Sequence, residues 1–187
     1  MAQFNWSPGI GDPTIGGWLT VALYLAATVS CWFTARSLGR GDTGNSQEHR
    51  AWQAIWVLFL ALGINKQLDL QSALTEVGRL LAQSQGWYAQ RQFVQQAFIA
   101  LVGVICAIVA ITLLIWARNA PFPTWVALTG TMMVLVFVLI RAASFHHMDR
   151  FIGERIFGLR WNWILEMSGI SIVFLASQRR RARLEWQ

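Results

Sequence analysis

Apolar residues along this chain gather in five long runs, and shorter polar segments separate them. Each run approaches the roughly 17–25 residues that a helix needs to cross the hydrocarbon core of a bilayer. The pattern therefore predicts an all-α integral membrane protein, in which about five transmembrane helices form a bundle within a single domain. The expected spans cover residues 18–35, 52–70, 94–117, 124–146 and 161–178.

Two of the five runs contain polar residues. The second run is apolar from Trp52 to Ile64 and then continues as NKQLDLQ, and the fifth carries Asn162 and Glu166 near its start. Ionisable residues inside a membrane are costly, and they usually face the interior of the bundle. Four spans are therefore the alternative to five.

Residues 70–85 have the spacing of a further, amphipathic helix. Polar residues recur every three or four positions, while leucines and other apolar residues line another face. We expect this segment to lie at the outer membrane surface and to connect the second span to the third, with a lid as the alternative. The polar face starts within the second run and comprises Asn65, Asp69, Ser72, Glu76 and Arg79.

The composition also favours a membrane protein. The chain is 55% hydrophobic and only 13% charged, whereas about a quarter of the residues in a soluble domain are charged. The net charge of +6 could indicate a nucleic acid as partner. However, four arginines lie together in the sequence RRRAR directly after the last apolar run, where they would orient the chain in a bilayer. We therefore expect the lipid bilayer and other membrane proteins as partners, and no nucleic acid.

The arginines predict on which side each terminus lies. The N-terminal segment has neither Lys nor Arg, whereas Arg36 and Arg40 follow the first run and RRRAR follows the last. Because Lys and Arg concentrate in cytoplasmic loops, we expect an outer N-terminus and a cytoplasmic C-terminus, most simply in a bacterial inner membrane. Tryptophans near the ends of the runs fit this arrangement, since indole rings prefer the membrane interface. These are Trp18, Trp32, Trp52, Trp116, Trp125, Trp161 and Trp163.

Polar residues from three segments meet on the expected outer side. Asp69 and Glu166 have side chains too short to reach far toward water, so each needs a cationic partner. Lys66 and Arg141 are the candidates, and we expect a network that fixes the register of the helices. The expected cluster comprises Asn65, Lys66, Gln67, Asp69, Arg141, Ser144, Asn162 and Glu166. The cytoplasmic ends show nothing comparable.

Two adjacent histidines are the strongest candidates for a metal-binding or cofactor-binding site. Neighbours in a regular helix point about 100° apart, so His146 and His147 cannot both face one ligand. Together with carboxylates they could still bind a divalent metal. A histidine near tryptophans could also ligate a haem or a chlorophyll-type macrocycle. The candidate metal ligands are His146, His147, Asp149, Asp69 and Glu166.

Three functional hypotheses follow. The first is a non-catalytic multi-span subunit or assembly factor of a larger membrane complex, whose outer polar cluster holds its own bundle and docks a partner. The second is a metal-dependent hydrolase that acts on a lipid or lipid-linked substrate at the outer leaflet. The third is a pigment-binding membrane protein. Direct pairing of Asp69 and Glu166 with Lys66 and Arg141 would favour the first, whereas ligands around one common point would favour the second.

Overall fold

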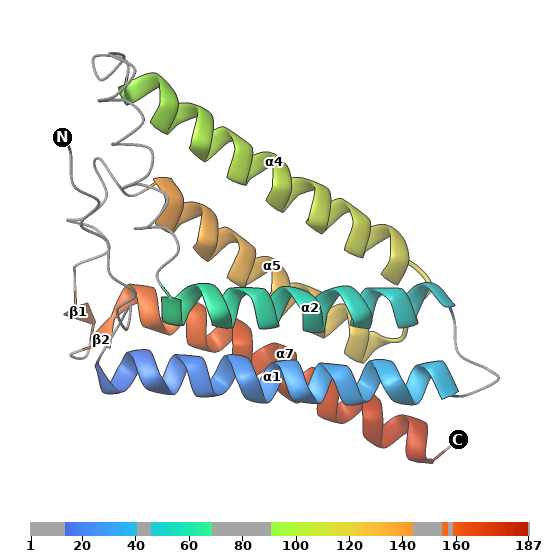
Figure 1. The fold of residues 1–187 in the computed structure, drawn as a ribbon. Coiled ribbons are helices and arrows are strands. Elements are labelled where there is room, and N and C mark those ends of the chain that lie inside the picture. Colours follow the sequence, from blue (N-terminus) through green and yellow to red (C-terminus); the bar gives the residue numbers. More distant parts are fainter. Residues whose placement is uncertain (1–13, 41–45, 69–90, 144–154, 157–158, 187) are drawn as a thin grey trace.

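The computed structural model of the protein describes residues 14–40, 46–68, 91–143, 155–156 and 159–186, and most of them lie in five long helices (Figure 1). A hairpin of two very short antiparallel strands, β1 (Arg155–Ile156) and β2 (Leu159–Arg160), precedes the last helix. The helices are α1 (Ile15–Arg40), α2 (Ser46–Leu68), α4 (Arg91–Ala117), α5 (Phe122–Ala143) and α7 (Trp161–Glu185).

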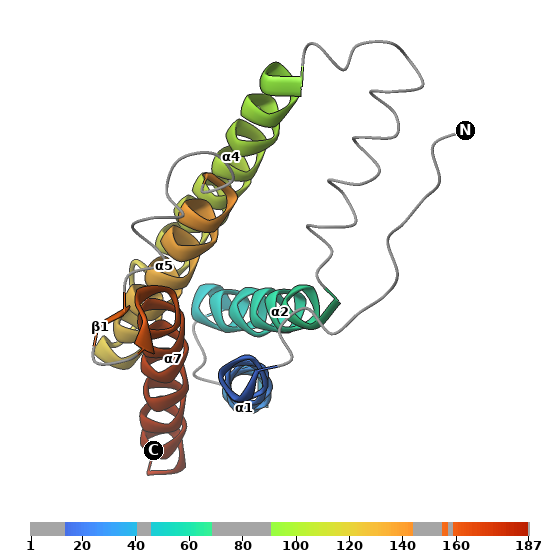
Figure 2. The ribbon, with the colours of Figure 1, turned by 90° about the vertical axis from the view of Figure 1, so that its left-hand side faces the viewer.

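Successive helices run in opposite directions, so the bundle has two ends (Figure 1). We name the end where α1, α4 and α7 begin the Glu166 end, and the end where α2 and α5 begin the Glu48 end. Figure 2 shows α1 and α2 nearly end-on and α4, α5 and α7 obliquely, so the two groups cross at an angle. Helix α7 packs against both α1 and α5, whereas α4 touches the rest of the bundle through α5 and α2.

Three of the described helices contain a segment long and apolar enough to cross a membrane, namely α1, α4 and α5. The prediction of an all-helical bundle is therefore confirmed, and the three candidate spans support a membrane protein. Helices α2 and α7 match the second and fifth expected runs in position, and their crossing of a membrane stays a prediction. The expected amphipathic helix at 70–85 lies outside the described residues.

The helices extend beyond the apolar runs at the Glu48 end. Helix α1 continues to Arg40, α2 already begins at Ser46, and α7 continues through the RRRAR sequence to Glu185. Helix formation needs only satisfied backbone hydrogen bonds, so a helix can continue past the apolar run into polar sequence. This extension brings Glu48 of α2 and Arg180 of α7 together outside the apolar runs.

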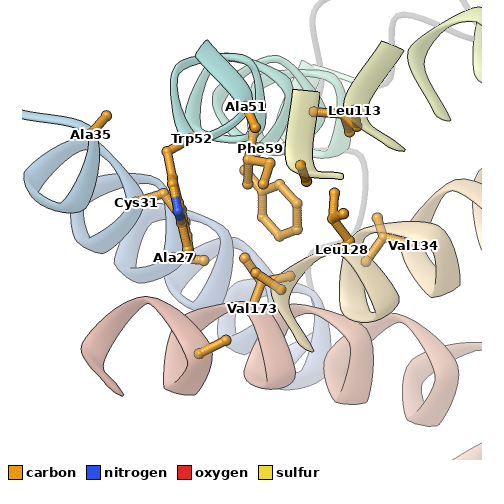
Figure 3. Packing of buried hydrophobic residues seen from close by; sticks show 14 of the residues in the cluster. Ala27, Cys31, Ala35, Ala51, Trp52, Phe59, Leu113, Leu128, Val134 and Val173 are labelled. Carbon is orange, nitrogen blue, oxygen red and sulfur yellow. The ribbon is translucent and has the colours of Figure 1, made fainter. Parts of the chain in front are cut away.

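The hydrophobic core lies between α1, α2, α5 and α7. Trp52 and Phe59 of α2 point into this space, where Leu128 of α5 and Val173 of α7 meet them (Figure 3). Both cysteines, Cys31 of α1 and Cys106 of α4, are buried. Helix α4 adds Leu113 to the core and turns a long aliphatic face outward.

Helices α5 and α7 cross at a contact between two glycines. A Cβ atom on Gly130 would lie 2.8 Å from the carbonyl oxygen of Gly169 and 2.9 Å from Cγ2 of Val173. A Cβ on Gly169 would lie 2.8 Å from Cγ2 of Val134. Backbone atoms cannot give way as a flexible side chain can, so this crossing depends on the absence of side chains at both positions.

We expect Gly130→Ala to lower the free energy of unfolding by about 1–3 kcal/mol, because the new methyl group forces α5 and α7 apart. Gly103→Ala on α4 is the matched control, since its Cβ would meet only Cδ2 of Leu139 at 3.9 Å. Thermal unfolding in mild detergent measures both. Equal midpoints for the two variants would contradict the close crossing.

Candidate functional site

A buried carboxylate organises the Glu166 end of the bundle. The Nζ atom of Lys66 on α2 lies 2.9 Å from Oε2 of Glu166 on α7, and the two side chains are only 6% and 2% exposed. The hydroxyl of Tyr24 on α1 donates a hydrogen bond of 3.2 Å to Oε1 of the same carboxylate. Both carboxylate oxygens of Glu166 are therefore engaged, and three helices are joined at this point.

Local packing positions Tyr24 and Lys66 next to Glu166. The absence of a side chain at Gly63, one turn before Lys66, lets α2 approach α1, because a Cβ there would lie 3.1 Å from Cβ of Tyr24. The ring of Tyr24 also packs against Phe59, with centroids 5.8 Å apart. Lys66 lies in the last turn of α2, where the partial negative charge of the helix C-terminus favours a cation.

A small pocket of about 190 Å³ opens beside this ion pair. One side carries polar residues, namely Asn65, Lys66, Arg141 and Glu166, and the other side is apolar. Its lining contains two cations and one carboxylate. The apolar residues come from α2, α4 and α5: Leu62, Phe98, Val102, Phe137, Val138 and Ala142.

The structure brings together part of the polar cluster expected from the sequence. Lys66 pairs with Glu166, and the half-buried Arg141 and the exposed Asn65 line the same pocket. The half-buried Gln67 does not line it. Asn162 lies in the first turn of α7, and only its backbone is described. Asp69 and Ser144 lie outside the described residues, so the expected pairing of Asp69 stays a prediction.

The candidate metal site lies mostly outside the described part of the chain. His146, His147, Asp149 and Asp69 belong to undescribed segments, and of this set only Glu166 is described. Within the described residues, no group of three His, Cys, Asp or Glu side chains is placed to hold a metal ion. The carboxylate of Glu166 is held by Lys66 and Tyr24.

A second buried network lies at the Glu48 end. Arg180 of α7 donates from Nε to Oε1 of Glu48 at 2.8 Å and from Nη2 to Oε2 at 3.0 Å. Thr124 of α5 donates to Oε1 of Glu48 at 2.6 Å, and the indole Nε1 of Trp52 donates to the Thr124 hydroxyl at 3.2 Å. The Arg180 and Glu48 side chains are 10% and 2% exposed. The expectation that the helix ends predicted to be cytoplasmic hold nothing comparable is therefore wrong.

Both Glu48 and Arg180 lie in strongly polar sequence, where solvation is the usual outcome, so neither is expected to be buried. The helical spacing of Glu48 relative to apolar residues is the feature of the sequence that indicates its burial. Glu48 shares one face of α2 with Trp52, Ile55 and Phe59, which are all fully buried. Trp52, expected near the membrane interface, has its ring in the core and a partner for its N–H inside the bundle, and its depth in a membrane stays a prediction.

Hydroxyl groups join α1 to α7 between the two ion pairs. The hydroxyls of Ser30 and Ser177 share a buried hydrogen bond, and the Thr34 hydroxyl lies 3.2 Å from the Ser177 carbonyl oxygen. Thr34 also contacts the carbonyl oxygen of Ser30 at 3.1 Å. Helix α7 is thus held to α2 by an ion pair near each end, and to α1 by the Tyr24–Glu166 hydrogen bond and by these hydroxyl contacts one turn before Arg180.

No family model, curated protein or solved structure matches this chain. The function must therefore be argued from the geometry of the chain itself.

Proposed function

We propose that the protein is a non-catalytic membrane subunit or assembly factor whose five helices all cross the membrane. One observation carries this proposal: two buried ion pairs of reversed polarity connect α2 to α7. Helix α2 supplies Glu48 at one end and Lys66 at the other, and α7 supplies the matching Arg180 and Glu166.

The positions of the pairs fit a bilayer. At 1.5 Å per residue, Glu48 and Lys66 are separated by roughly 27 Å along α2, and Glu166 and Arg180 by roughly 21 Å along α7. The hydrocarbon core of a bilayer is about 30 Å thick. Each pair would then lie near one membrane interface, with mostly apolar helix between them. A charge in this setting is tolerated when it faces a partner inside the bundle.

The distribution of the arginines predicts which end of the bundle is cytoplasmic. The Glu48 end carries Arg36, Arg40 and the arginines of the RRRAR sequence, so we place it in the cytoplasm and the Glu166 end outside. A bacterial inner membrane is the simplest setting. Under this arrangement, the pocket beside Glu166 opens near the outer leaflet.

Direct pairing supports a structural role for the outer cluster. Glu166 accepts from Lys66 and from Tyr24, and the ammonium of Lys66 balances its charge, so the buried carboxylate is accounted for without a metal or a substrate. Partner contact would fall on α4, because this helix exposes Leu101, Ile105 and Ile108 along one face. Another membrane-spanning helix is a suitable partner for such an aliphatic face.

Co-purification and site-specific cross-linking test the proposal. We expect the chain, extracted in mild detergent, to carry a constant set of other membrane proteins. A photoreactive residue at Ile108 on α4 should cross-link to one of them in native membranes. The same residue at Val136, which is an exposed position on α5, is the control. A solitary protein whose Ile108 cross-links only to lipid would contradict the role as a subunit.

A further inference from the structure

The Glu48 end contains a second pocket, which lies between α1 and α2 and takes no part in the ion-pair network. It is open to the surface and has a volume of about 410 Å³, within the roughly 300–1,000 Å³ that is usual for small-molecule sites. Its main lining residues are Trp32, Arg36 and Arg40 from α1 and His49, Gln53 and Trp56 from α2. We call it the arginine pocket.

The lining of the arginine pocket is basic and aromatic. Within the part of the chain that the structure describes, the lining contains Arg36 and Arg40 and no acidic residue. The guanidinium of Arg36 lies over the ring of Trp32, 5.2 Å from its centroid, a contact that holds the cation in place. The nearby carboxylate of Glu48 is already held by Arg180. Among the described residues, no carboxylate forms an ion pair with Arg36 or Arg40.

His49 makes one wall of the pocket rigid. Its Nδ1 lies 2.8 Å from the carbonyl oxygen of Ala35, which can only accept, so Nδ1 carries a proton. Its Nε2 lies 3.2 Å from Nε2 of Gln53, so both ring nitrogens have a hydrogen-bond partner. Gly39 leaves room for this ring, since a Cβ there would lie 2.9 Å from its Cε1.

Trp56 adds a second aromatic wall to the arginine pocket. Its indole Nε1 has almost no exposed surface, and no described residue accepts a hydrogen bond from it. A molecule in the open pocket would therefore contact the ring of Trp56 and not its N–H.

We propose that the arginine pocket binds the phosphate group of an anionic phospholipid. Arg36 and Arg40 donate to the phosphate oxygens, as guanidinium groups do in many phosphate sites. The rings of Trp32 and Trp56 contact the glycerol and the first acyl carbons. The pocket lies at one end of α1, a candidate membrane span, and basic pockets between helices at the cytoplasmic surface are suited to anionic headgroups. Binding at this site does not depend on the partner protein of the proposed function.

Native mass spectrometry of the full chain in non-ionic detergent tests the proposal, with phosphatidylglycerol and phosphatidylcholine of identical acyl chains as probes. We expect phosphatidylglycerol to bind more tightly. Arg36→Gln and Arg40→Gln should each weaken it about fivefold, and the double variant about thirtyfold. Arg179→Gln is the control, because Arg179 is exposed at the same end of the bundle and does not line the pocket. Its affinity should equal that of the original protein.

Trp56→Phe keeps an aromatic ring in place and reduces the aromatic surface that lines the pocket, so we expect phosphatidylglycerol to bind a few fold more weakly without loss of folding. This variant keeps the proposal testable if the double arginine variant fails to fold. Equal affinity for the two lipids, or unchanged binding in both Trp56→Phe and the arginine variants, would overturn the proposal. Displacement of phosphatidylglycerol by an equal concentration of inorganic phosphate would also overturn it, because the ligand would then be a free anion.

Discussion

Glu48→Gln should lower the free energy of unfolding by about 3–5 kcal/mol. The substitution preserves the size of the side chain but leaves the guanidinium of Arg180 buried without a counter-charge, and losing one partner of a buried pair usually costs this much. It also weakens the hydrogen bond from Thr124, to which Trp52 donates in turn. Titration with SDS in mixed micelles, followed by tryptophan fluorescence, measures the loss.

Glu185→Gln is the matched control for this experiment. Glu185 also pairs with an arginine, but its oxygen lies 3.9 Å from Nε of Arg181 and the two side chains are 70% and 34% exposed. An exposed pair of this kind contributes about 0–1 kcal/mol. The double variant Glu48→Gln, Arg180→Gln should recover part of the loss, because it removes the unpaired charge. If Glu48→Gln and Glu185→Gln were equally stable, the buried network would not exist as described.

Lys66→Met should also cost about 3–5 kcal/mol, because it leaves Glu166 as an unpaired carboxylate that is only 2% exposed. Met has nearly the same length as Lys and keeps the apolar contacts of the side chain. We expect the double variant Lys66→Met, Glu166→Gln to recover much of this stability and to retain the partner proteins. Recovery of stability in the double variant would show that the loss in Lys66→Met comes from the unpaired charge of Glu166.

Arg141→Met provides the comparison at the same pocket. Arg141 is half-buried, and no described residue pairs with it, so we expect a loss below about 1 kcal/mol. A loss as large as that of Lys66→Met would show that Arg141 has a strong partner. Asp69, which lies outside the described residues, is the partner that the sequence predicts. Recovery in Arg141→Met, Asp69→Asn would then identify it.

Some of these features could be predicted from sequence because their physical cause is local. A long apolar run indicates a helix by length alone, and the five runs match the positions of the five helices. The pairing of Lys66 with Glu166 follows from a carboxylate too short to reach water, which needs a nearby cation. That argument uses depth within a run, and depth can be read from the sequence.

Other features depend on which helix faces meet, and the sequence does not specify this directly. Glu48 and Arg180 lie in polar sequence that looks solvated, and only their periodicity with buried residues such as Trp52 and Val173 marks them as inward-facing. The contact of Gly130 with Gly169 depends on the crossing of α5 over α7. From the sequence, Arg36 and Arg40 indicate only the orientation of the chain in the membrane. That they line a pocket becomes visible only when the facing surfaces of α1 and α2 are known.

Cysteine labelling at positions on either side of α2 and α7 tests most directly whether both helices cross the membrane. Single cysteines replace Thr43, Ser84, Gly153 and Glu185 in a background without Cys31 and Cys106, and an impermeant maleimide is added to intact cells. We expect Ser84→Cys and Gly153→Cys to be labelled from outside, and Thr43→Cys and Glu185→Cys only after permeabilisation. If the two positions that flank α2, or the two that flank α7, were labelled from the same side, that helix would not cross the membrane.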